Sequence, residues 1–311
     1  MPDEFSRIAR YLAPLAGEAG LGLRDDAAVL APPPGRELVL TVDQMLEGVH
    51  FLSGDDPALI ARKLLRRNLS DLAAMGAAPL GYLLTTALPV SLPEDWLAGF
   101  AAGLRQDQEI FNIELLGGDS SSSLHGIALT ATLLGTVAPG AALRRNGARA
   151  GDEIWVTGTI GDAVLGLQAR RGQREDPTGF FTQRSRLPAP RIGLELAGIV
   201  SAAIDVSDGL VQDLSHIAEE SGLRAVIEAA RVPASPEAAA LGEDVLQARL
   251  TGGDDYELIL AVPPGRESGL KAACGDLPVT RIGAFEPGAG VRVLSAAGTE
   301  MAFKSLGWKH F

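Results

Sequence analysis

Apolar residues recur along this chain with two different periods, and together these periods predict a mixed α/β protein. Short apolar runs at 37–42, 80–88 and 127–137 are bounded by Gly and Pro, which is typical of strands. Between residues 57 and 75 the spacing is helical instead, with apolar side chains at Leu59, Ile60, Leu64, Leu65, Leu69, Leu72 and Ala73. Strands and helices therefore alternate through the first half of the chain.

The same pattern predicts two domains. In the first half we expect helices at 4–12, 57–75 and 93–112 and strands at 27–30, 37–42, 80–88, 113–116 and 127–137. A polar break rich in Arg and Gly at 144–152 separates these from strands at 153–156, 225–227, 256–262 and 291–294 and helices at 162–170, 191–203 and 211–220. The predicted domains are 1–143 and 144–311, in line with a length of 311 residues.

Aspartates recur beside small residues next to these apolar runs. They occur in the phrases DD (25–26), TVD (41–43), NLSD (68–71), GGD (117–119), DVSD (205–208) and GGDD (252–255). Buried carboxylates need a cationic partner, and Mg²⁺ prefers oxygen ligands shared between one or two carboxylates and substrate phosphates. A single Asp beside Gly is more often a turn or a helix cap. Six such phrases together predict a magnesium-dependent phosphoryl-transfer site.

Other candidate residues have two interpretations each. His50 is more commonly a packed loop histidine than a ligand, and Cys274 fits a core position. Arg145 is either a solvent-exposed residue of the linker or a phosphate ligand. The second interpretation rests on the ability of a guanidinium to bind phosphate oxygens bidentately. Ser207 either caps the following helix or donates to a phosphate, and Asp71 lies on a helix either exposed or pointing inward.

The amino-acid composition argues against several classes of function. The formal net charge of −12 argues against binding nucleic acid or an anionic membrane, both of which need a basic surface. A single cysteine excludes a disulfide framework and a Cys-based zinc site, and favours a reducing, cytoplasmic location. The acidic, polar N-terminus has no signal-peptide pattern, and the uncharged stretch 72–93 contains three prolines and two glycines. The sequence has no GxxxxGK[ST] phosphate loop.

A set of longer motifs resembles the thiamine-monophosphate kinase family along the chain from residue 4 to residue 311. The motifs are GLRDDAAV (22–29), TVDQMLEGVHF (41–51), NLSDLAAMGA (68–77), GGD (117–119), RRNGARAGD (144–152), PAPR (188–191), IDVSDGL (204–210), GGDDYEL (252–258) and GWKHF (307–311). The carboxylate phrases are shared more loosely with aminoimidazole ribonucleotide synthetase and selenophosphate synthetase.

The resemblance implies an activity, a fold and a set of site residues. The activity is ATP-dependent phosphorylation of thiamine monophosphate to thiamine diphosphate with several Mg²⁺ ions. The fold is a two-domain α/β (α+β) architecture of the aminoimidazole ribonucleotide synthetase type, whose N-terminal metal- and ATP-binding domain also pairs in a homodimer through its sheet. The implied ligands are Asp26, Thr41, Asp43, Asp71, Asp119, Asp205 and Asp208 for magnesium, Gly118, Asp119, Arg145 and Ser207 for ATP, and His50, Asp254 and Trp308 for thiamine monophosphate, with Asp43 and Asp119 central to catalysis.

The chain departs from the family pattern at a few positions. Arg24 stands where the family has Gly, Val42 where it has a hydroxyl residue, and 120–123 are four serines where it has TTRG; Asp254 replaces a glutamate. These changes affect expected ligand contacts more than the reaction type. The alternatives are another ATP-using member of the superfamily and a non-catalytic nucleotide- or metal-binding relative; the absence of a reactive cysteine near the N-terminus argues against selenophosphate synthetase.

Overall fold

The computed structural model describes residues 4–308, which fold into two compact units. The first unit contains the residues up to 72 together with 77–140, and the second contains 73–76 and the residues from 141 onward. Both combine helices with a β-sheet, so the α/β class expected from the sequence is confirmed. The domain boundary after residue 143 stays a prediction.

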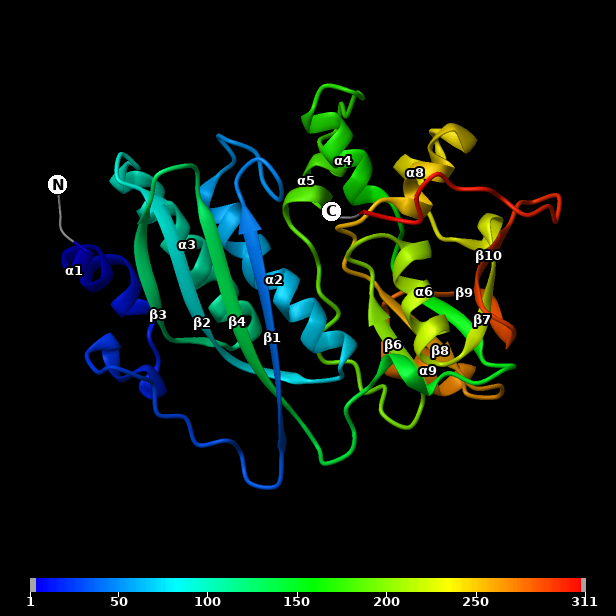
Figure 1. The fold of residues 1–311 in the computed structure, drawn as a ribbon, viewed down its shortest axis with the longest axis horizontal. Coiled ribbons are helices and arrows are strands. Elements are labelled where there is room, and N and C mark those ends of the chain that lie inside the picture. Colours follow the sequence, from blue (N-terminus) through cyan, green and yellow to red (C-terminus); the bar gives the residue numbers. More distant parts are fainter. Residues whose placement is uncertain (1–3, 309–311) are drawn as a thin grey trace. The chain divides into compact units, whose positions relative to one another are not determined.

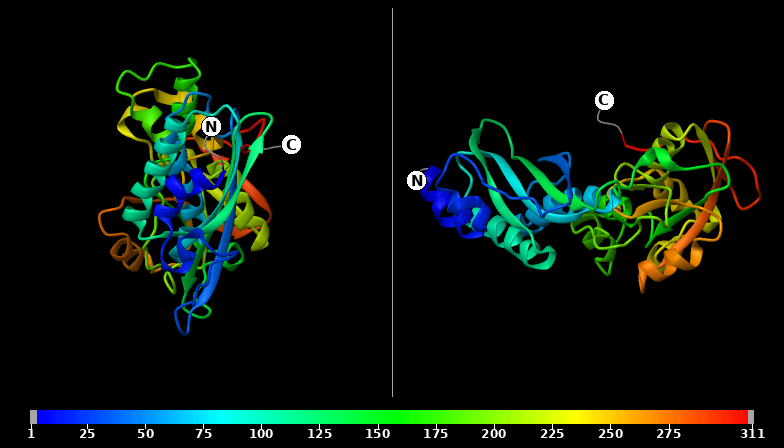
Figure 2. Two further views of the ribbon diagram at one scale, coloured as in Figure 1. Left: turned by 90° about the vertical axis from the view of Figure 1, so that its left-hand side faces the viewer. Right: turned by 90° about the horizontal axis from the view of Figure 1, so that it is seen from below.

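A four-stranded sheet is the framework of the first unit. Its strands are β1 (Glu37–Leu46), β2 (Ala78–Pro89), β3 (Glu114–Ser123) and β4 (Ala128–Val137), in the order β1-β4-β2-β3. Strand β4 runs antiparallel to β1 and β2, whereas β2 and β3 are parallel. Helices α2 (Pro57–Ala74) and α3 (Glu94–Phe111) lie against one face of this sheet (Figures 1 and 2).

The burial of β4 shows which face the helices cover. Leu129, Ala131 and Leu133 are buried, and the intervening Thr130 and Thr132 are half-buried. Because successive side chains of a strand point to opposite faces, the buried set faces the helices and the other set lies on the uncovered face. Each β1 residue lies on the same face of the sheet as the β4 residue with which it pairs.

The N-terminal segment lies along the free edge of this sheet at β3. It consists of α1 (Glu4–Arg7), the π-helical η1 (Ile8–Leu12) and the 3-10 segments η2 (Ala13–Leu15) and η3 (Glu18–Leu23). The amide of Gly17 donates to the carbonyl oxygen of Leu115 at 3.3 Å, which ties the segment to β3. The helix predicted at 4–12 is thus helical, but with a change of type at Ile8. The strand predicted at 27–30 is wrong, because residues 24–36 contain three successive prolines and pair with no strand of the described chain.

A six-stranded sheet forms the centre of the second unit. Its order is β10-β7-β9-β5-β8-β6, and only β10 and β7 are parallel neighbours. The strands are β5 (Glu153–Thr157), β6 (Ala202–Asp205), β7 (Leu223–Glu228), β8 (Leu258–Val262), β9 (Val279–Pro287) and β10 (Gly290–Leu294).

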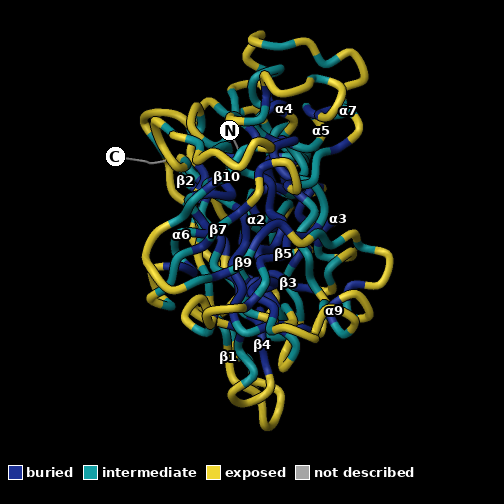
Figure 3. The backbone as a smooth tube through the Cα atoms, turned by 90° about the vertical axis from the view of Figure 1, so that its right-hand side faces the viewer, coloured by how far each residue is buried: buried dark blue, intermediate teal, exposed yellow. Residues whose placement is uncertain are grey.

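Helices cover both faces of this second sheet. Ile154 and Val156 pack with α6 (Leu210–Glu220), while Trp155 between them packs with α9 (Glu267–Cys274) on the other face. Buried strand residues therefore form the centre of the unit, which is dark blue in Figure 3. Cys274 belongs to the α9 cluster, and its burial raises the pKa of the thiol, so the predicted core position is confirmed.

Smaller helical segments complete the second unit. They are η4 (Arg145–Gly147), α4 (Asp162–Arg170), α5 (Phe180–Arg186), η5 (Ala229–Arg231), α7 (Pro236–Ala239), η6 (Gly242–Val245) and α8 (Leu246–Thr251). The helix predicted at 191–203 is wrong: this stretch forms turns and then β6, which pairs with β8. Across residues 4–308, none of the helices has the length and apolar character needed to cross a membrane.

Candidate functional site

Three predicted metal ligands of the first unit meet on the helix-covered face of the sheet. Asp43 pairs with Ala131 in β4 and forms an ion pair with Arg67 of α2, with Oδ1 and Nη2 3.3 Å apart. Two residues earlier on β1, the hydroxyl of Thr41 donates to Oδ2 of Asp71 at 2.5 Å. Asp71 therefore points from α2 toward the sheet, which resolves its two interpretations in favour of the inward one.

Asp43 lies inside β1 and not at its end as the sequence pattern suggested. The strand continues to Leu46 because pairing with β4 extends through Ala128. The mid-strand carboxylate is tolerated because it is half-buried and paired with Arg67. Arg67 was not a candidate from the sequence, since it lies 24 residues after Asp43 and only the fold brings the two side chains together.

Asp26 and Asp119 line a cavity of about 670 Å³ in the first unit. Thr85, which pairs with Asp119, and Gly118 are also in its lining. Asp119 lies within β3, whereas the pattern suggested a position after a strand. Gly118 permits this course of the backbone, because a Cβ there would lie 1.8 Å from the carbonyl oxygen of Leu84.

The first unit thus offers its carboxylates in two sets, Thr41, Asp43 and Asp71 on the helix-covered face and Asp26 with Asp119 at the cavity. Among residues 4–308, no three His, Cys, Asp or Glu side chains form a group able to hold a metal ion by themselves. Magnesium commonly takes only one or two carboxylates and completes its shell with water and substrate phosphates. The oxygen donors of both sets fit such an ion.

His50 closes a turn after β1. Its Nδ1 accepts a hydrogen bond from the amide of Leu46 at 3.0 Å, and its own amide donates to the carbonyl oxygen of the same residue at 2.9 Å. Lys63 Nζ donates to the carbonyl oxygen of His50 at 3.3 Å. The imidazole is half-buried, so these contacts describe the packed loop interpretation, and the role toward substrate stays a prediction.

In the second unit, the carboxyl group of Asp213 organises the loop that carries Asp205, Ser207 and Asp208. Its Oδ2 accepts from the amides of Ser207, Asp208 and Gly209 at 2.9, 3.0 and 3.0 Å. Burial raises the pKa of the Asp213 carboxyl to about 7, while the hydrogen bonds from these amides oppose that rise. Asp205 ends β6 and is buried, so the loop leaves the sheet directly at a carboxylate.

A second backbone segment, 252–256, packs against this loop. The amide of Asp254 donates to the carbonyl oxygen of Ser207 and that of Tyr256 to the carbonyl oxygen of Val206, both at 2.8 Å. Asp254 and Tyr256 have φ of 71° and 54°, a left-handed conformation that costs energy in residues other than Gly. The buried Tyr256 hydroxyl donates to Oδ1 of Asp254 at 2.9 Å, which directs the predicted substrate ligand.

The C-terminal segment docks on the same loop. The Trp308 amide donates to the carbonyl oxygen of Asp208 at 3.0 Å, and Gln212 Nε2 donates to the carbonyl oxygen of Trp308 at 2.8 Å. Gln212 Nε2 also lies 3.1 Å from Oδ2 of Asp208. Trp308 is 48% exposed, so its backbone is fixed while much of the side chain faces solvent.

Two buried carboxylates on either side of Tyr256 were not predicted as site residues from the sequence. Glu257 forms an ion pair through both oxygens with Arg191, the arginine of the PAPR motif, and accepts from Thr157 at 2.7 Å. Asp255 accepts from the amides of Gly161 and Ala163 at 2.7 and 3.2 Å, and burial raises its pKa to about 8. The motif itself was the available signal for Arg191, although its partner was not visible.

Arg145 lies in η4 at the start of the second unit and is exposed. Its carbonyl oxygen accepts from the Ser221 hydroxyl at 3.1 Å, which fixes the backbone at this position. The exposed guanidinium is compatible both with the solvated linker and with a phosphate clamp.

Comparison with known proteins now identifies the family. Models of the AIR synthase related protein match at residues 24–137 for the N-terminal domain and 149–295 for the C-terminal domain. The thiamine-monophosphate kinase of Caulobacter vibrioides is 43% identical, over 99% of this chain and 91% of that protein. The chain belongs to the thiamine-monophosphate kinase family.

Solved structures of thiamine-monophosphate kinases agree with this assignment. The crystal structure of the enzyme from Stenotrophomonas maltophilia K279a has a TM-score of 0.81 and 38% identity, covering 87% of this chain and 89% of that one. The structure of AaThiL complexed with AMPPCP and TMP has a TM-score of 0.80 and 32% identity, covering 99% and 97%. The resemblance inferred from the motifs is therefore confirmed for the family, and the two-domain fold with it.

Proposed function

We infer that this chain transfers the terminal phosphoryl group of ATP to thiamine monophosphate and so produces thiamine diphosphate. The observation that carries the inference is the likeness to AaThiL complexed with AMPPCP and TMP, which extends over 99% of the chain. The 43% identity to a thiamine-monophosphate kinase over the same share of the chain supports it independently.

The proposed reaction requires little covalent chemistry from the protein. The accepting oxygen belongs to a phosphate that is already ionised at neutral pH, so direct in-line transfer needs no strong general base and no phosphoenzyme. The barrier lies in bringing two anionic phosphates together. Bound Mg²⁺ would supply the positive charge that offsets this repulsion. The residues that would hold it are Asp26, Thr41, Asp43, Asp71, Asp119, Asp205 and Asp208.

Separate groups would hold the two substrates. Gly118 and Asp119 at the 670 Å³ cavity, with Arg145 and Ser207, would contact ATP. His50, Asp254 and Trp308 would contact thiamine monophosphate. Support for Asp254 comes from the Tyr256 hydroxyl, which holds its carboxylate, and support for Trp308 comes from its exposed indole, which suits a cationic thiazolium.

We also propose that the chain works as a homodimer that pairs through the uncovered face of the first sheet. Leu38, Leu40 and Val42 alternate along β1 on this face and are 44%, 62% and 60% exposed. Leu40→Glu should shift the mass measured by light scattering from two chains to one, whereas an unchanged mass would reject this surface.

The test of the proposed activity is ADP release that depends on thiamine monophosphate. Purified protein with ATP and Mg²⁺ should release ADP only when thiamine monophosphate is present, and phosphorus NMR should show thiamine diphosphate as the product. Thiamine itself is the matched control, because it lacks the accepting phosphate. ADP release that does not depend on thiamine monophosphate would favour another ATP-using enzyme of the superfamily. Nucleotide binding without turnover would favour a non-catalytic relative.

A further inference from the structure

A cationic side chain lies among the candidate metal ligands of the first unit. Thr41 and Asp43, two residues apart on β1, share the helix-covered face of the sheet. Arg67 and Asp71, four residues apart on α2, are neighbours on one side of that helix. The two elements meet at both positions, because Arg67 pairs with Asp43 and the Thr41 hydroxyl donates to Asp71. We call these four residues the Asp43 cluster.

Arg67 supplies the positive charge that Asp43 needs. The Asp43 side chain is 26% exposed and that of Arg67 is 12% exposed, with Oδ1 and Nη2 3.3 Å apart. A carboxylate that is largely removed from water requires a cationic partner, and a guanidinium stays charged at any working pH. Two carboxylates and one guanidinium leave the Asp43 cluster with a single net negative charge.

A divalent ion at Asp43 would meet Arg67 as a competitor. Both cations require the same carboxylate oxygens, and two positive charges a few ångströms apart repel each other strongly where little water screens them. The guanidinium cannot relieve this repulsion by losing its proton. An ion that binds Asp43 must therefore displace the Arg67 side chain, and the loss of that ion pair opposes metal binding.

We propose that Arg67 is an internal counter-ion that competes with the divalent metal ion for Asp43. Arg67 is a positioning residue in this role, since it holds the carboxylate on the helix-covered face until an ion takes its place. The consequence is a lower affinity for the metal ion, so that half-maximal turnover requires more Mg²⁺ than the carboxylates alone would demand. The inference rests on the proposed kinase function, which supplies the reason for a metal ion at this position.

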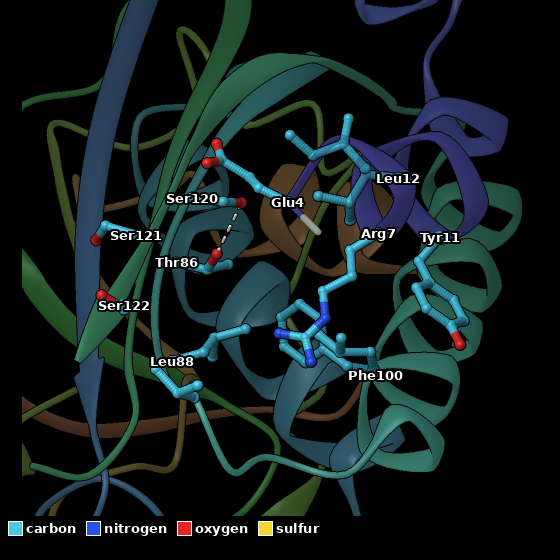
Figure 4. A pocket seen from close by; sticks show the side chains of 13 residues that line it. Glu4, Arg7, Tyr11, Leu12, Thr86, Leu88, Phe100, Ser120, Ser121 and Ser122 are labelled. Atoms are coloured by element: carbon cyan, nitrogen blue, oxygen red, sulfur yellow. Dashed lines mark hydrogen bonds between the residues drawn. The ribbon is translucent and has the colours of Figure 1, made fainter. Parts of the chain in front are cut away.

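A second arginine–carboxylate pair in the first unit provides a matched control. Arg7 lies at a smaller cavity of about 250 Å³, as Figure 4 shows. Its guanidinium pairs with Glu94 at 2.9 Å from Nε and 2.8 Å from Nη2, and the two side chains are 24% and 31% exposed. Glu94 is not a candidate metal ligand. Loss of Arg7 therefore removes the same charge and the same kind of ion pair without uncovering a candidate ligand.

The decisive experiment measures metal binding in the absence of nucleotide. Mn²⁺ is the probe, because it takes the same oxygen ligands as Mg²⁺ and its unbound form is counted directly by electron paramagnetic resonance. Arg67→Met should bind one Mn²⁺ at least about tenfold more tightly than the wild type, since it removes a positive charge beside the ion. Arg67→Lys should stay within about threefold of the wild type because it keeps that charge. Arg7→Met should bind Mn²⁺ like the wild type.

A double variant tests whether the effect arises at Asp43. Asp43→Asn removes the contested carboxylate, so adding Arg67→Met to it should give no further gain in Mn²⁺ affinity. A gain that persists in the double variant would overturn the inference. Unchanged Mn²⁺ affinity in a folded Arg67→Met protein would overturn it as well.

A second measurement covers the case in which Arg67→Met does not fold. Arg67→Gln removes the charge and retains a hydrogen-bond donor for Asp43. Its melting temperature should rise more with Mn²⁺ than that of the wild type, because an ion that binds the folded state stabilises it in proportion to its affinity. An equal rise in both proteins would overturn the inference and leave the kinase function intact. Absence of ADP release that depends on thiamine monophosphate, with the Mn²⁺ gain present, would instead reject the kinase function and leave the competition at Asp43 standing.

Discussion

One pair of candidate carboxylates in each unit, Asp26 with Asp119 and Asp208 with Asp254, shows how differently such groups are held. In the second unit, Asp208 and Asp254 lie on two backbone segments that hydrogen-bond to each other, and Asp213 accepts three amides of the first segment. In the first unit, Asp26 and Asp119 are exposed, and within residues 4–308 neither side chain forms a hydrogen bond or ion pair. The segments that carry Asp208 and Asp254 are therefore fixed by the protein itself, whereas Asp26 and Asp119 are carboxylates that a bound ion or phosphate would have to order.

The largest effect is expected from an exposed carboxylate of the first unit. Asp119→Asn should lower kcat by at least about a hundredfold, because it removes a full negative charge where metal and nucleotide are expected to meet. Its melting temperature should equal that of the wild type, since the Asp119 side chain is exposed and forms no hydrogen bond or ion pair within the described chain. Asp95→Asn, at an exposed position on α3, is the control. Near-normal turnover of Asp119→Asn at limiting Mg²⁺ would remove Asp119 from the catalytic centre.

Asp213 tests whether advance ordering of the second unit matters for turnover. Asp213→Ala leaves three amides without their acceptor, and loss of such a supporting group typically costs about 10- to 100-fold in metal affinity or activity. The Mg²⁺ concentration for half-maximal rate should rise, and Asp213→Asn, which retains one acceptor oxygen, should recover part of the loss. A variant that is less stable but has an unchanged Mg²⁺ dependence would limit Asp213 to folding.

Trp308 gives a smaller effect that is specific to one substrate. Trp308→Ala should raise KM for thiamine monophosphate by an amount equivalent to roughly 0.5–2 kcal/mol, the range for a cation lying over an indole ring. KM for ATP should not change, and Trp308→Phe should restore part of the affinity. Because the backbone contacts to Asp208 and Gln212 survive these substitutions, equal damage toward both substrates would point to undocking of the C-terminal segment instead.

The smallest effect on turnover is expected from Asp255, whose influence is on stability. Burial raises the pKa of its carboxyl to about 8 in the folded state, above the ordinary 3.8, so the folded protein binds this proton more tightly than the unfolded one. The stability that results is complete below about pH 4 and is lost as the pH rises through about 8; a pKa difference of one corresponds to about 1.4 kcal/mol. Urea unfolding should show this decline for the wild type and not for Asp255→Asn. An equal pH dependence of both proteins would assign the decline to other groups.

Elements with strong internal periodicity were predictable from the sequence. The helix expected at 57–75 is α2 at Pro57–Ala74, because its apolar residues repeat over five turns and do not depend on distant partners. The segments at 27–30 and 191–203 were mispredicted because their state depends on what they pair with: the first finds no partner strand, and the end of the second pairs with β8. In short segments the periodicity of apolar residues extends over too few positions to predict such pairing.

The candidate site divides in the same manner. The motifs identified the family and named the candidate carboxylates, since both depend on residue type and order. They did not reveal Arg67 opposite Asp43, Tyr256 holding Asp254, or the three amides at Asp213. These contacts are created by the fold, so the sequence alone does not show which candidate residues are already neutralised or fixed in position.

The burial of Cys274 has a practical consequence for site-specific labelling. Because the single thiol of the chain is 6% exposed and its pKa is raised, it should react slowly with maleimides in the folded protein. A cysteine introduced at Leu124, which is 94% exposed in the turn after β3, could then be labelled selectively without first removing the native one. A fluorophore at that position would then report on the first unit alone, because the native thiol lies in the second.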